Sequence, residues 1–364
     1  GRRFFKVALP LARPAIAVGA SLALMETLND IGASEFLGVQ TLTVSIYSTW
    51  VNRSSLPGAA QIALFMLAIV VSLIVLERWA RRHQRYADGA RQRRPLTRKK
   101  LTGWRWMLVL LACLPIVLGF AAPAAYLALE AAERISFAGV DSRILQQAGN
   151  TLLISAIATL VAAVLAFVLV YTLRQAREAR GVRILVRLAS LGYAIPGTVL
   201  AIGLLGPLAF LDGVIDSSSQ WLLGAGTGLL LSGTGAVLVY AYVARFLAIG
   251  NGSIEAGFHK IPQSLDDAAQ SLGVNAGKRA RRVHLPLSRP AIAAAMLLIF
   301  VDCMKELPAT LLLRPLNFET LATHLYGEAA RGTYESGALA ALLIVLAGLV
   351  PIILLSHYGN SATR

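Results

Sequence analysis

The dominant feature of the chain is the alternation of long apolar segments with short polar ones. A transmembrane helix needs about 20 mainly apolar residues, and eight segments of the chain reach this length. The pattern therefore predicts an all-α polytopic membrane protein with eight membrane-spanning helices. The predicted spans are 14–37, 58–77, 106–129, 147–171, 187–211, 226–249, 291–313 and 336–357.

Composition supports a membrane protein. Of the 364 residues, 56% are hydrophobic and only 15% are charged, which is more apolar surface than a soluble domain buries. The net charge of +15 could indicate a nucleic-acid partner if the basic residues formed one face of a domain. They lie instead in short clusters between apolar runs, so we expect a lipid bilayer and no nucleic acid. Cys113 and Cys303 both lie in apolar stretches, where we expect packing and no disulfide.

The distribution of Lys and Arg predicts the orientation in the membrane. They concentrate at the N-terminus and in the loops 78–105, 172–186 and 250–290. By the positive-inside rule these loops face the cytoplasm, with both termini inside. The most charged stretch, 78–105, contains "RRHQRY" and "RQRRPLTRKK". We interpret it as a basic cytoplasmic linker between two membrane units, and only secondarily as a site for anionic lipid headgroups.

One line of sequence occurs twice. "VALPLARPAIA" at 7–17 returns as "VHLPLSRPAIA" at 283–293, and "TLTVSIY" at 41–47 returns, with a small shift, as "TLATHLY" at 320–326. An even number of predicted spans separates the two copies, so they run in the same direction across the membrane. Such parallel repeats are typical of transport proteins.

The repeat divides the chain into two unequal units. Residues 1–77 hold two predicted helices that correspond to the last two of the second unit, 106–364, which has six. Residues 78–105 join them. We therefore expect 1–77 to be the C-terminal part of a first six-helix unit, with its other four helices upstream of Gly1.

The predicted cytoplasmic loop 250–290 carries a spaced motif within "DDAAQSLGVNAGKRARRVHLPLSRPAI". Acidic residues favour the N-terminal end of a short helix, which we expect Ser264 to cap. Two alanines allow a partner surface to approach closely, and a glycine provides the left-handed residue that ends the helix. Pro286 and Pro290 are expected to interrupt regular structure before the next span. The motif positions are Asp267, Ala268, Ala269, Gly273, Val283, Leu285 and Pro286.

This pattern resembles the signature loop of permease subunits of binding-protein-dependent ABC importers, with Asp267 in place of the usual Glu. The resemblance implies the type I ABC importer permease fold and a multi-pass location in the bacterial inner membrane. It implies that the loop helix docks into a cleft of an ATP-binding subunit and transmits its closure. The implied partners are two such subunits and a periplasmic substrate-binding protein. The alternative is an amphipathic re-entry loop without a partner.

The chain does not carry a phosphate-binding loop of its own. The nearest stretch, "GVNAGKR" at 273–279, has three residues between its glycines where four are needed, and no Ser or Thr follows Lys278. We therefore expect a permease that is not an enzyme and binds no cofactor, with ATP and Mg²⁺ held by the partner subunit.

Ionisable residues inside predicted spans form a second motif. Placing one charged side chain at the centre of the bilayer costs about 2.5–3.5 kcal/mol. We therefore expect these side chains to face protein or water. A Pro or Gly follows each group and predicts a broken helix, as in transport pathways. The alternative is that Lys305 pairs with Asp302 or Glu306 only to hold helices together. The possible translocation-path residues are Glu26 and Asp30 in the first copy and Asp302, Lys305 and Glu306 in the second.

The stretch "KELPATLLLRPLNFETLATHLY" at 305–326 resembles ferric-iron ABC importer permeases, whose two six-helix halves are commonly fused in one chain. The resemblance implies uptake of Fe(III) delivered by a periplasmic binding protein, and hard carboxylate oxygens suit such a cation. No residue is assigned as a resident metal ligand. The alternatives are the same machinery for thiamine, phosphonate, sulfate or polyamine, or a secondary transporter in which the four carboxyls carry protons.

Overall fold

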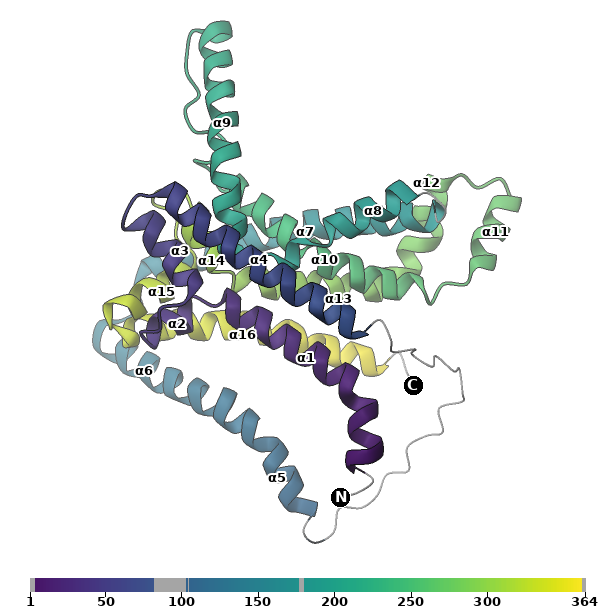
Figure 1. Ribbon diagram of the computed structural model, residues 1–364, viewed down its shortest axis with the longest axis horizontal. Coiled ribbons are helices and arrows are strands. Elements are labelled where there is room, and N and C mark those ends of the chain that lie inside the picture. The colour runs from purple at the N-terminus through teal and green to yellow at the C-terminus, as the bar shows by residue number, and fades with distance from the viewer. Residues whose placement is uncertain (1–3, 82–102, 104, 177–179, 362–364) are drawn as a thin grey trace.

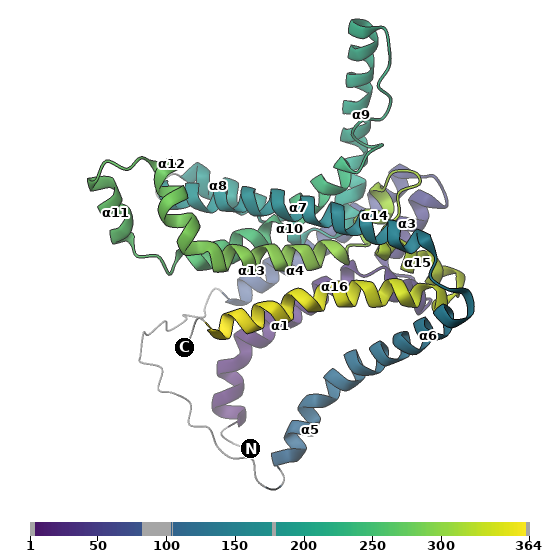
Figure 2. The ribbon, with the colours of Figure 1, turned by 180° about the vertical axis from the view of Figure 1, so that it is seen from behind.

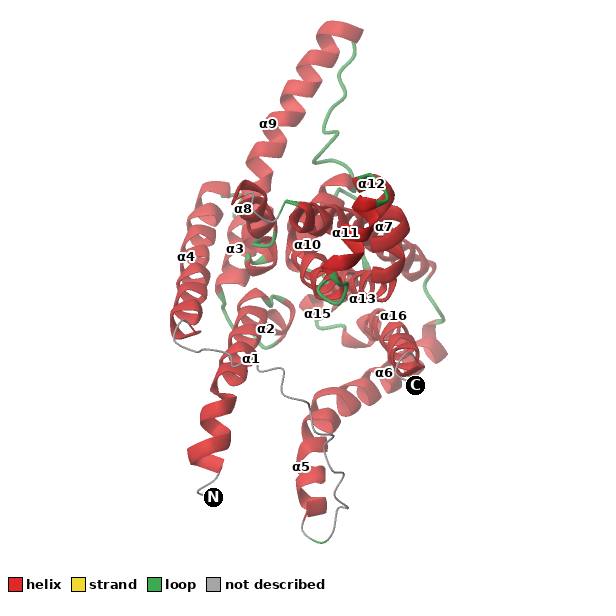
Figure 3. Ribbon diagram, turned by 90° about the vertical axis from the view of Figure 1, so that its right-hand side faces the viewer, coloured by secondary structure: helices red, strands yellow, loops and turns green. Residues whose placement is uncertain are grey.

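The computed structural model describes residues 4–81, 103, 105–176 and 180–361 (Figure 1). Every regular element within these residues is a helix (Figure 3), which confirms the all-α prediction. Most of the predicted linker, 82–102, lies outside the described residues. The first part contains η1 (Phe4–Ala8), α1 (Leu9–Asn29), α2 (Gly32–Phe36), α3 (Leu42–Val51) and α4 (Leu56–Arg81).

The second part begins with one long apolar segment, α5 to α6, that bends at the π-helical turn η2. Its first elements are α5 (Arg105–Ile116), η2 (Val117–Ala121), α6 (Ala122–Ala138), α7 (Ser142–Gln175), α8 (Arg180–Ala189), η3 (Gly192–Ala194), α9 (Gly197–Leu223) and α10 (Ala236–Phe258). The remainder are α11 (Gln263–Ser271), α12 (Ala276–Arg279), η4 (Ala280–His284), α13 (Leu285–Met304), α14 (Pro308–Leu313), α15 (Leu321–Arg331) and α16 (Tyr334–Ser361).

Six helices in the described part of the chain are long and apolar enough to cross a membrane. The predicted count of eight is therefore not confirmed. Predicted span 14–37 corresponds to α1, which stops at Asn29. Span 336–357 lies within α16 (Tyr334–Ser361), of which Tyr334–Leu349 counts as a shorter apolar segment. The six are Leu56–Leu76, Trp106–Ala138, Ser142–Gln175, Gly197–Leu223, Ala236–Phe258 and Ala276–Met304.

Predicted span 187–211 is wrong as a single helix. The chain leaves helical geometry after Ala189 and begins a new helix, α9, at Gly197. Pro196 precedes α9 in an extended conformation (φ −57°, ψ 142°) and offers no backbone N–H to a preceding turn. Gly192 sits directly against the backbone carbonyl of Ala244, a contact that leaves no room for a side chain. Close packing of Gly192 on α10 therefore determines where the chain breaks between α8 and α9.

The two sequence repeats have the same succession of helices. Each contains a long helix, a break, a short helix, a loop, a helix capped by threonine and a return helix: α1 to α4 in the first and α13 to α16 in the second. Thr41 and Thr320 both accept a hydrogen bond from the backbone N–H three residues on. Figures 1 and 2 show α1 and α13 running in one direction and α4 and α16 returning.

The core centres on α10, which packs between α7 and α13. Small residues allow these helices to approach closely: Ala162, Ala241 and Ala295 are fully buried, and a Cβ on Gly250 would lie 2.8 Å from the Ala166 methyl carbon. Residues of α3 and α4, among them Ile46, join the same core from the first repeat. This packing places the ends of α1 and α13 next to each other.

Candidate functional site

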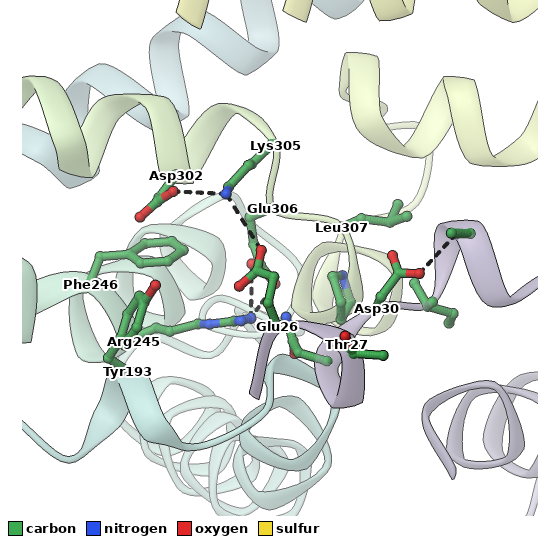
Figure 4. Close-up of a pocket in the computed structure, with 14 residues that line it drawn as sticks. Glu26, Thr27, Asp30, Tyr193, Arg245, Phe246, Asp302, Lys305, Glu306 and Leu307 are labelled. Carbon is green, nitrogen blue, oxygen red and sulfur yellow. Dashed lines mark hydrogen bonds and ion pairs between the residues drawn. The ribbon is translucent and has the colours of Figure 1, made fainter. Parts of the chain in front are cut away.

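A cavity of about 450 Å³ lies where α1 and α13 end (Figure 4). The structure brings together all of the predicted translocation-path residues in its wall. They come from both repeats, which lie far apart in sequence. The predicted residues in the lining are Glu26, Asp30, Asp302, Lys305 and Glu306, joined by Asn29, Tyr193, Arg245 and Phe246.

The predicted helix breaks form the cavity. Asp30 Oδ2 accepts a hydrogen bond of 3.1 Å from Ala33 N, at the start of α2. Glu306, the repeat equivalent of Asp30, likewise accepts one of 3.0 Å through Oε1 from Ala309 N, at the start of α14. Each carboxylate therefore satisfies a backbone donor of the short helix that follows the break. The two copies use the same capping arrangement.

Lys305 joins the two repeats electrostatically. Its Nζ lies 3.1 Å from Asp302 Oδ1 on the same segment and 3.5 Å from Glu26 Oε1 on α1. Of the two partners considered for Lys305, Asp302 is the one that it contacts. The Lys305 and Glu26 side chains are 52% and 63% exposed, so water in the cavity screens this pair and leaves it open to exchange.

Glu306 pairs instead with Arg245 of α10. Arg245 Nη1 lies 2.8 Å from both carboxylate oxygens of Glu306, and both side chains are buried. The Arg245 guanidinium also lies 5.5 Å from the centre of the Phe246 ring, within the range of a cation–π contact. The sequence interpretation missed Arg245. The signal was present, because Arg245 is an intramembrane cation within predicted span 226–249.

Gly197 brings α9 against this ion pair. A Cβ at Gly197 would collide with Arg245 Nη1 and would lie 2.7 Å from Glu306 Oε1. The backbone N–H of Gly197 also donates a 2.8 Å hydrogen bond to Asn29 Oδ1 at the end of α1. Gly197 therefore lies where α9 contacts both the end of α1 and the Arg245–Glu306 pair.

The cavity is lined by ionic groups, with more acidic than basic side chains. Four carboxylates face two cations, Arg245 and Lys305. Within the described ranges, no three His, Cys, Asp or Glu side chains are placed to hold a metal ion. Glu26 and Lys305 are the charged side chains of the cavity that are more than half exposed.

The predicted motif loop forms a projecting helix, α11, beyond the ends of α7 and α13 (Figures 1 and 2). Asp267 and Ala268 are exposed on α11, whereas Ala269 is buried. Gly273 follows the helix with φ +72°, as the sequence predicted for its end. The other motif residues, Val283, Leu285 and Pro286, lie where η4 passes into α13.

Two details of the predicted loop are wrong. Ser264 does not cap α11, because Pro262 occupies the capping position and makes no side-chain cap bond. Pro286 and Pro290 do not interrupt the chain, which stays helical from Ala276 to Met304. Pro286 falls in the first turn of α13, directly after the π-helical turn η4. The regular α-helical hydrogen-bond pattern is replaced by the π-helical turn directly before this proline, so the helix continues through it.

The fold and the site define an all-helical membrane protein with an ionic cavity at a repeat contact and a helix projecting from one end. Residues 1–86 and 174–363 match the family described as the binding-protein-dependent transport system inner membrane component. The chain belongs to this family.

Relatives with curated names include two iron permeases. The chain is 27% identical to an Fe(3+)-transport system permease protein FbpB 2 of Haemophilus influenzae, over 98% of the chain and 68% of that protein. It is 23% identical to a ferric transport system permease protein FbpB of Actinobacillus pleuropneumoniae, over 99% of the chain but 52% of the relative. A putative 2-aminoethylphosphonate transport system permease protein PhnV of Salmonella typhimurium is 27% identical over 44% of the chain and 54% of its own length.

Solved structures share the fold. A chain of a bacterial alginate ABC transporter, in complex with an alginate pentasaccharide-bound periplasmic protein, superposes with a TM-score of 0.56 at 17% identity. The superposition covers 72% of this chain and 96% of the other. A second structure, of an ABC transporter for import of the acidic polysaccharide alginate, gives a TM-score of 0.53 at 14% identity.

Proposed function

We propose that this chain forms part of the permease of an ABC importer that moves ferric iron, received from a periplasmic binding protein, through the cavity between its repeats. The observation that carries the proposal is the meeting of Glu26 and Asp302, equivalent residues of the two repeats, at the half-exposed ammonium of Lys305. A pathway between two repeats opens and closes when they move relative to each other. Groups contributed by both repeats are therefore separated by that movement.

Arrival of a cation has a defined electrostatic consequence in this cavity. Glu26 and Asp302 share Lys305 as their counter-ion, and a multivalent cation competes with the ammonium for both carboxylates. Glu306 stays bound to buried Arg245, because breaking a buried ion pair costs much more than breaking an exposed one. Glu26 and Asp302 thus act on the solute, whereas Glu306 and Asp30 hold the shape of the cavity.

The energy source in this proposal is ATP hydrolysis on separate subunits, two for each transporter, which bind ATP and Mg²⁺. The exposed face of α11, with Asp267 and Ala268, is the surface we assign to one of them. The left-handed backbone at Gly273 sets the direction in which the chain leaves that surface.

The same proposal fixes the arrangement in the bacterial inner membrane. Residues 1–77 belong to a first permease half, 78–105 form a cytoplasmic linker, and 106–364 form a second half with its coupling loop at 250–290. The basic segments face the cytoplasm, with both ends of the chain inside. In this orientation α11 and the ends of α7 and α13 face the ATP-binding subunits.

The test is transport by the complete permease, reconstituted in liposomes with its ATP-binding subunits and iron-loaded binding protein. ATP-dependent uptake of radioactive ferric iron is expected, and a Glu26→Gln, Asp302→Asn double variant should lower its rate at least tenfold. Glu133→Gln, which removes an exposed carboxyl on α6 outside the cavity, is the matched control and should transport normally. Uptake driven by a proton gradient without ATP would instead support a secondary transporter.

A second substrate class has a specific observation in its favour. The cavity presents the half-exposed ammonium of Lys305 beside its carboxylates, an arrangement that suits a zwitterion such as an aminophosphonate. The PhnV relative is named for such a solute. Isolation of the cognate binding protein and identification of its ligand decides between the two, because a phosphonate ligand would contradict the iron proposal directly.

A further inference from the structure

The buried face of α11 holds a second charged cluster, distinct from the cavity. Asp266 is the acidic residue that α11 turns inward, with 4% of its surface exposed, whereas its neighbour Asp267 faces outward. A buried carboxylate is costly unless every oxygen is paired. The partners of Asp266 therefore show which parts of the molecule hold α11 in place.

The first partner is Arg174, at the end of α7. Its guanidinium donates from Nε to Asp266 Oδ2 at 2.8 Å. It also donates from Nη1 to the Phe258 carbonyl at 2.8 Å and from Nη2 to the Ile261 carbonyl at 3.0 Å. These carbonyls lie in the turn between α10 and α11. One arginine thus fixes both the inward carboxylate of α11 and the chain that leads into it.

The second partner is His284, at the junction of η4 and α13. It is fully buried, and its Nε2 lies 2.7 Å from Asp266 Oδ1. The ring lies 5.2 Å, centre to centre, from both Tyr171 and Phe258. His284 Nδ1 has no hydrogen-bond partner, so the ring meets Asp266 through Nε2 alone. Nε2–H then donates to the carboxylate.

The electrostatics agree with an ionised Asp266. Burial by itself raises the pKa of Asp266, but the hydrogen bonds from Arg174 and His284 outweigh burial and lower that pKa below its usual value. Both carboxylate oxygens are engaged, one by each partner. Asp266 therefore ties α11 to α7 through one oxygen and to α13 through the other.

The two helices tied to α11 by Asp266, α7 and α13, connect it to the core and the cavity. From His284 the chain is helical to Met304, so Asp302 lies about 27 Å further along the same helix axis. Arg174 ends α7, whose buried side chains pack on α10 and α13 through the core. The helix anchored at His284 is therefore the same helix that carries the cavity carboxylate Asp302.

We propose that Arg174, Asp266 and His284 form the mechanical link through which movement of α11 reaches α7 and α13, with Arg174 and His284 as positioning residues. This inference rests on the proposed docking of an ATP-binding subunit on α11. The link differs from the docking surface itself, because all three side chains are buried and none is available to a partner.

The test separates coupling from assembly. The complete permease complex is purified with its ATP-binding subunits and reconstituted, and three quantities are measured: ATP-binding subunit retained, ATP hydrolysed and solute taken up. Arg174→Gln and His284→Leu should retain the subunit and hydrolyse ATP, while solute taken up per ATP falls at least fivefold. His284→Gln, whose amide can donate in place of Nε2–H, should recover at least half of the wild-type ratio.

Arg180→Gln, which changes an exposed arginine on α8, is the matched control and should leave the ratio unchanged. Wild-type uptake per ATP in both Arg174→Gln and His284→Leu overturns the mechanical link and leaves the docking proposal standing. Loss of the ATP-binding subunit from both His284→Leu and His284→Gln also overturns the mechanical link, because the cluster would then only maintain the fold. A wild-type permease that retains no ATP-binding subunit overturns the docking proposal itself.

Discussion

Tyr47 and Tyr326, the last residues of "TLTVSIY" and "TLATHLY", pack edge to face with ring centres 5.7 Å apart. Contact between equivalent residues of two repeats places them close to a two-fold axis. The short helices agree, since the contact of α2 with α15 is matched by the equivalent contact of α14 with α3. The cavity carboxylates Glu26 and Asp302, which are also equivalent, meet at Lys305. The pathway we propose thus follows the contact between the repeats.

Removal of one partner from the buried Arg245–Glu306 pair should destabilise the protein. Glu306→Gln leaves the Arg245 charge uncompensated, and we expect a loss of about 3 kcal/mol or more in the free energy of unfolding. An Arg245→Met, Glu306→Leu double variant should recover most of that loss, because it removes both charges. Thermal unfolding in detergent measures both. Equal losses in the single and double variants would show that the charges do not control stability there.

The control for this prediction lies in the same cavity. Glu26→Gln removes a carboxylate that is largely exposed, and it should cost less than about 1 kcal/mol. A loss as large as that of Glu306→Gln would contradict the division between shape-holding and solute-facing carboxylates.

Gly197→Ala should disturb the cavity although it adds only one methyl group. The new Cβ collides with the Arg245–Glu306 pair, and overpacking of this kind costs about 1–3 kcal/mol. Gly203→Ala on the same helix is the matched control, since nothing lies within 4 Å of its added Cβ. We expect lower unfolding temperature and impaired transport for Gly197→Ala alone. Identical behaviour of the two variants would argue against the contact.

Gly273→Ala tests the end of α11. The backbone there has φ +72°, and an L-residue pays about 1–2 kcal/mol in the left-handed region. We expect α11 to change orientation or fray, with reduced retention of the ATP-binding subunit on co-purification. Gly277→Ala, with ordinary φ and open space around its Cβ, should bind normally. Undiminished coupling in a variant with a bulky residue at Gly273 would refute the docking role.

Acid should loosen the attachment of α11. Because Arg174 and His284 lower the folded-state pKa of Asp266, its contribution to stability is present above its unfolded value, about 3.9. That contribution is lost as the pH falls through the lower folded-state pKa. Unfolding temperature measured between pH 6 and pH 2 should decline less steeply for Asp266→Asn than for wild type. Asp267→Asn, which keeps Asp266, serves as control, and parallel declines for all three proteins would contradict the assignment.

The all-helical class of fold and the charged residues within the apolar segments could both be recognised in the sequence. Apolar runs of span length require helices, because backbone polar groups in lipid must be paired within the segment. Glu26, Asp30, Asp302, Lys305 and Glu306 stood out because charge inside such a run is expensive. The repeat placed the four carboxyls in equivalent positions, and Gly273 marked the end of α11 through a backbone conformation that few other residues adopt.

The tertiary structure decided which charges meet. The sequence spacing placed Lys305 and Asp302 on one helical face. Glu306 instead pairs with Arg245, because α13 ends at this point and α10 packs alongside. The inward turn of Asp266 likewise depends on Arg174 and His284, which lie 92 and 18 residues away. Local pattern fixes periodicity and conformational preference, whereas pairing between distant segments depends on how the helices pack.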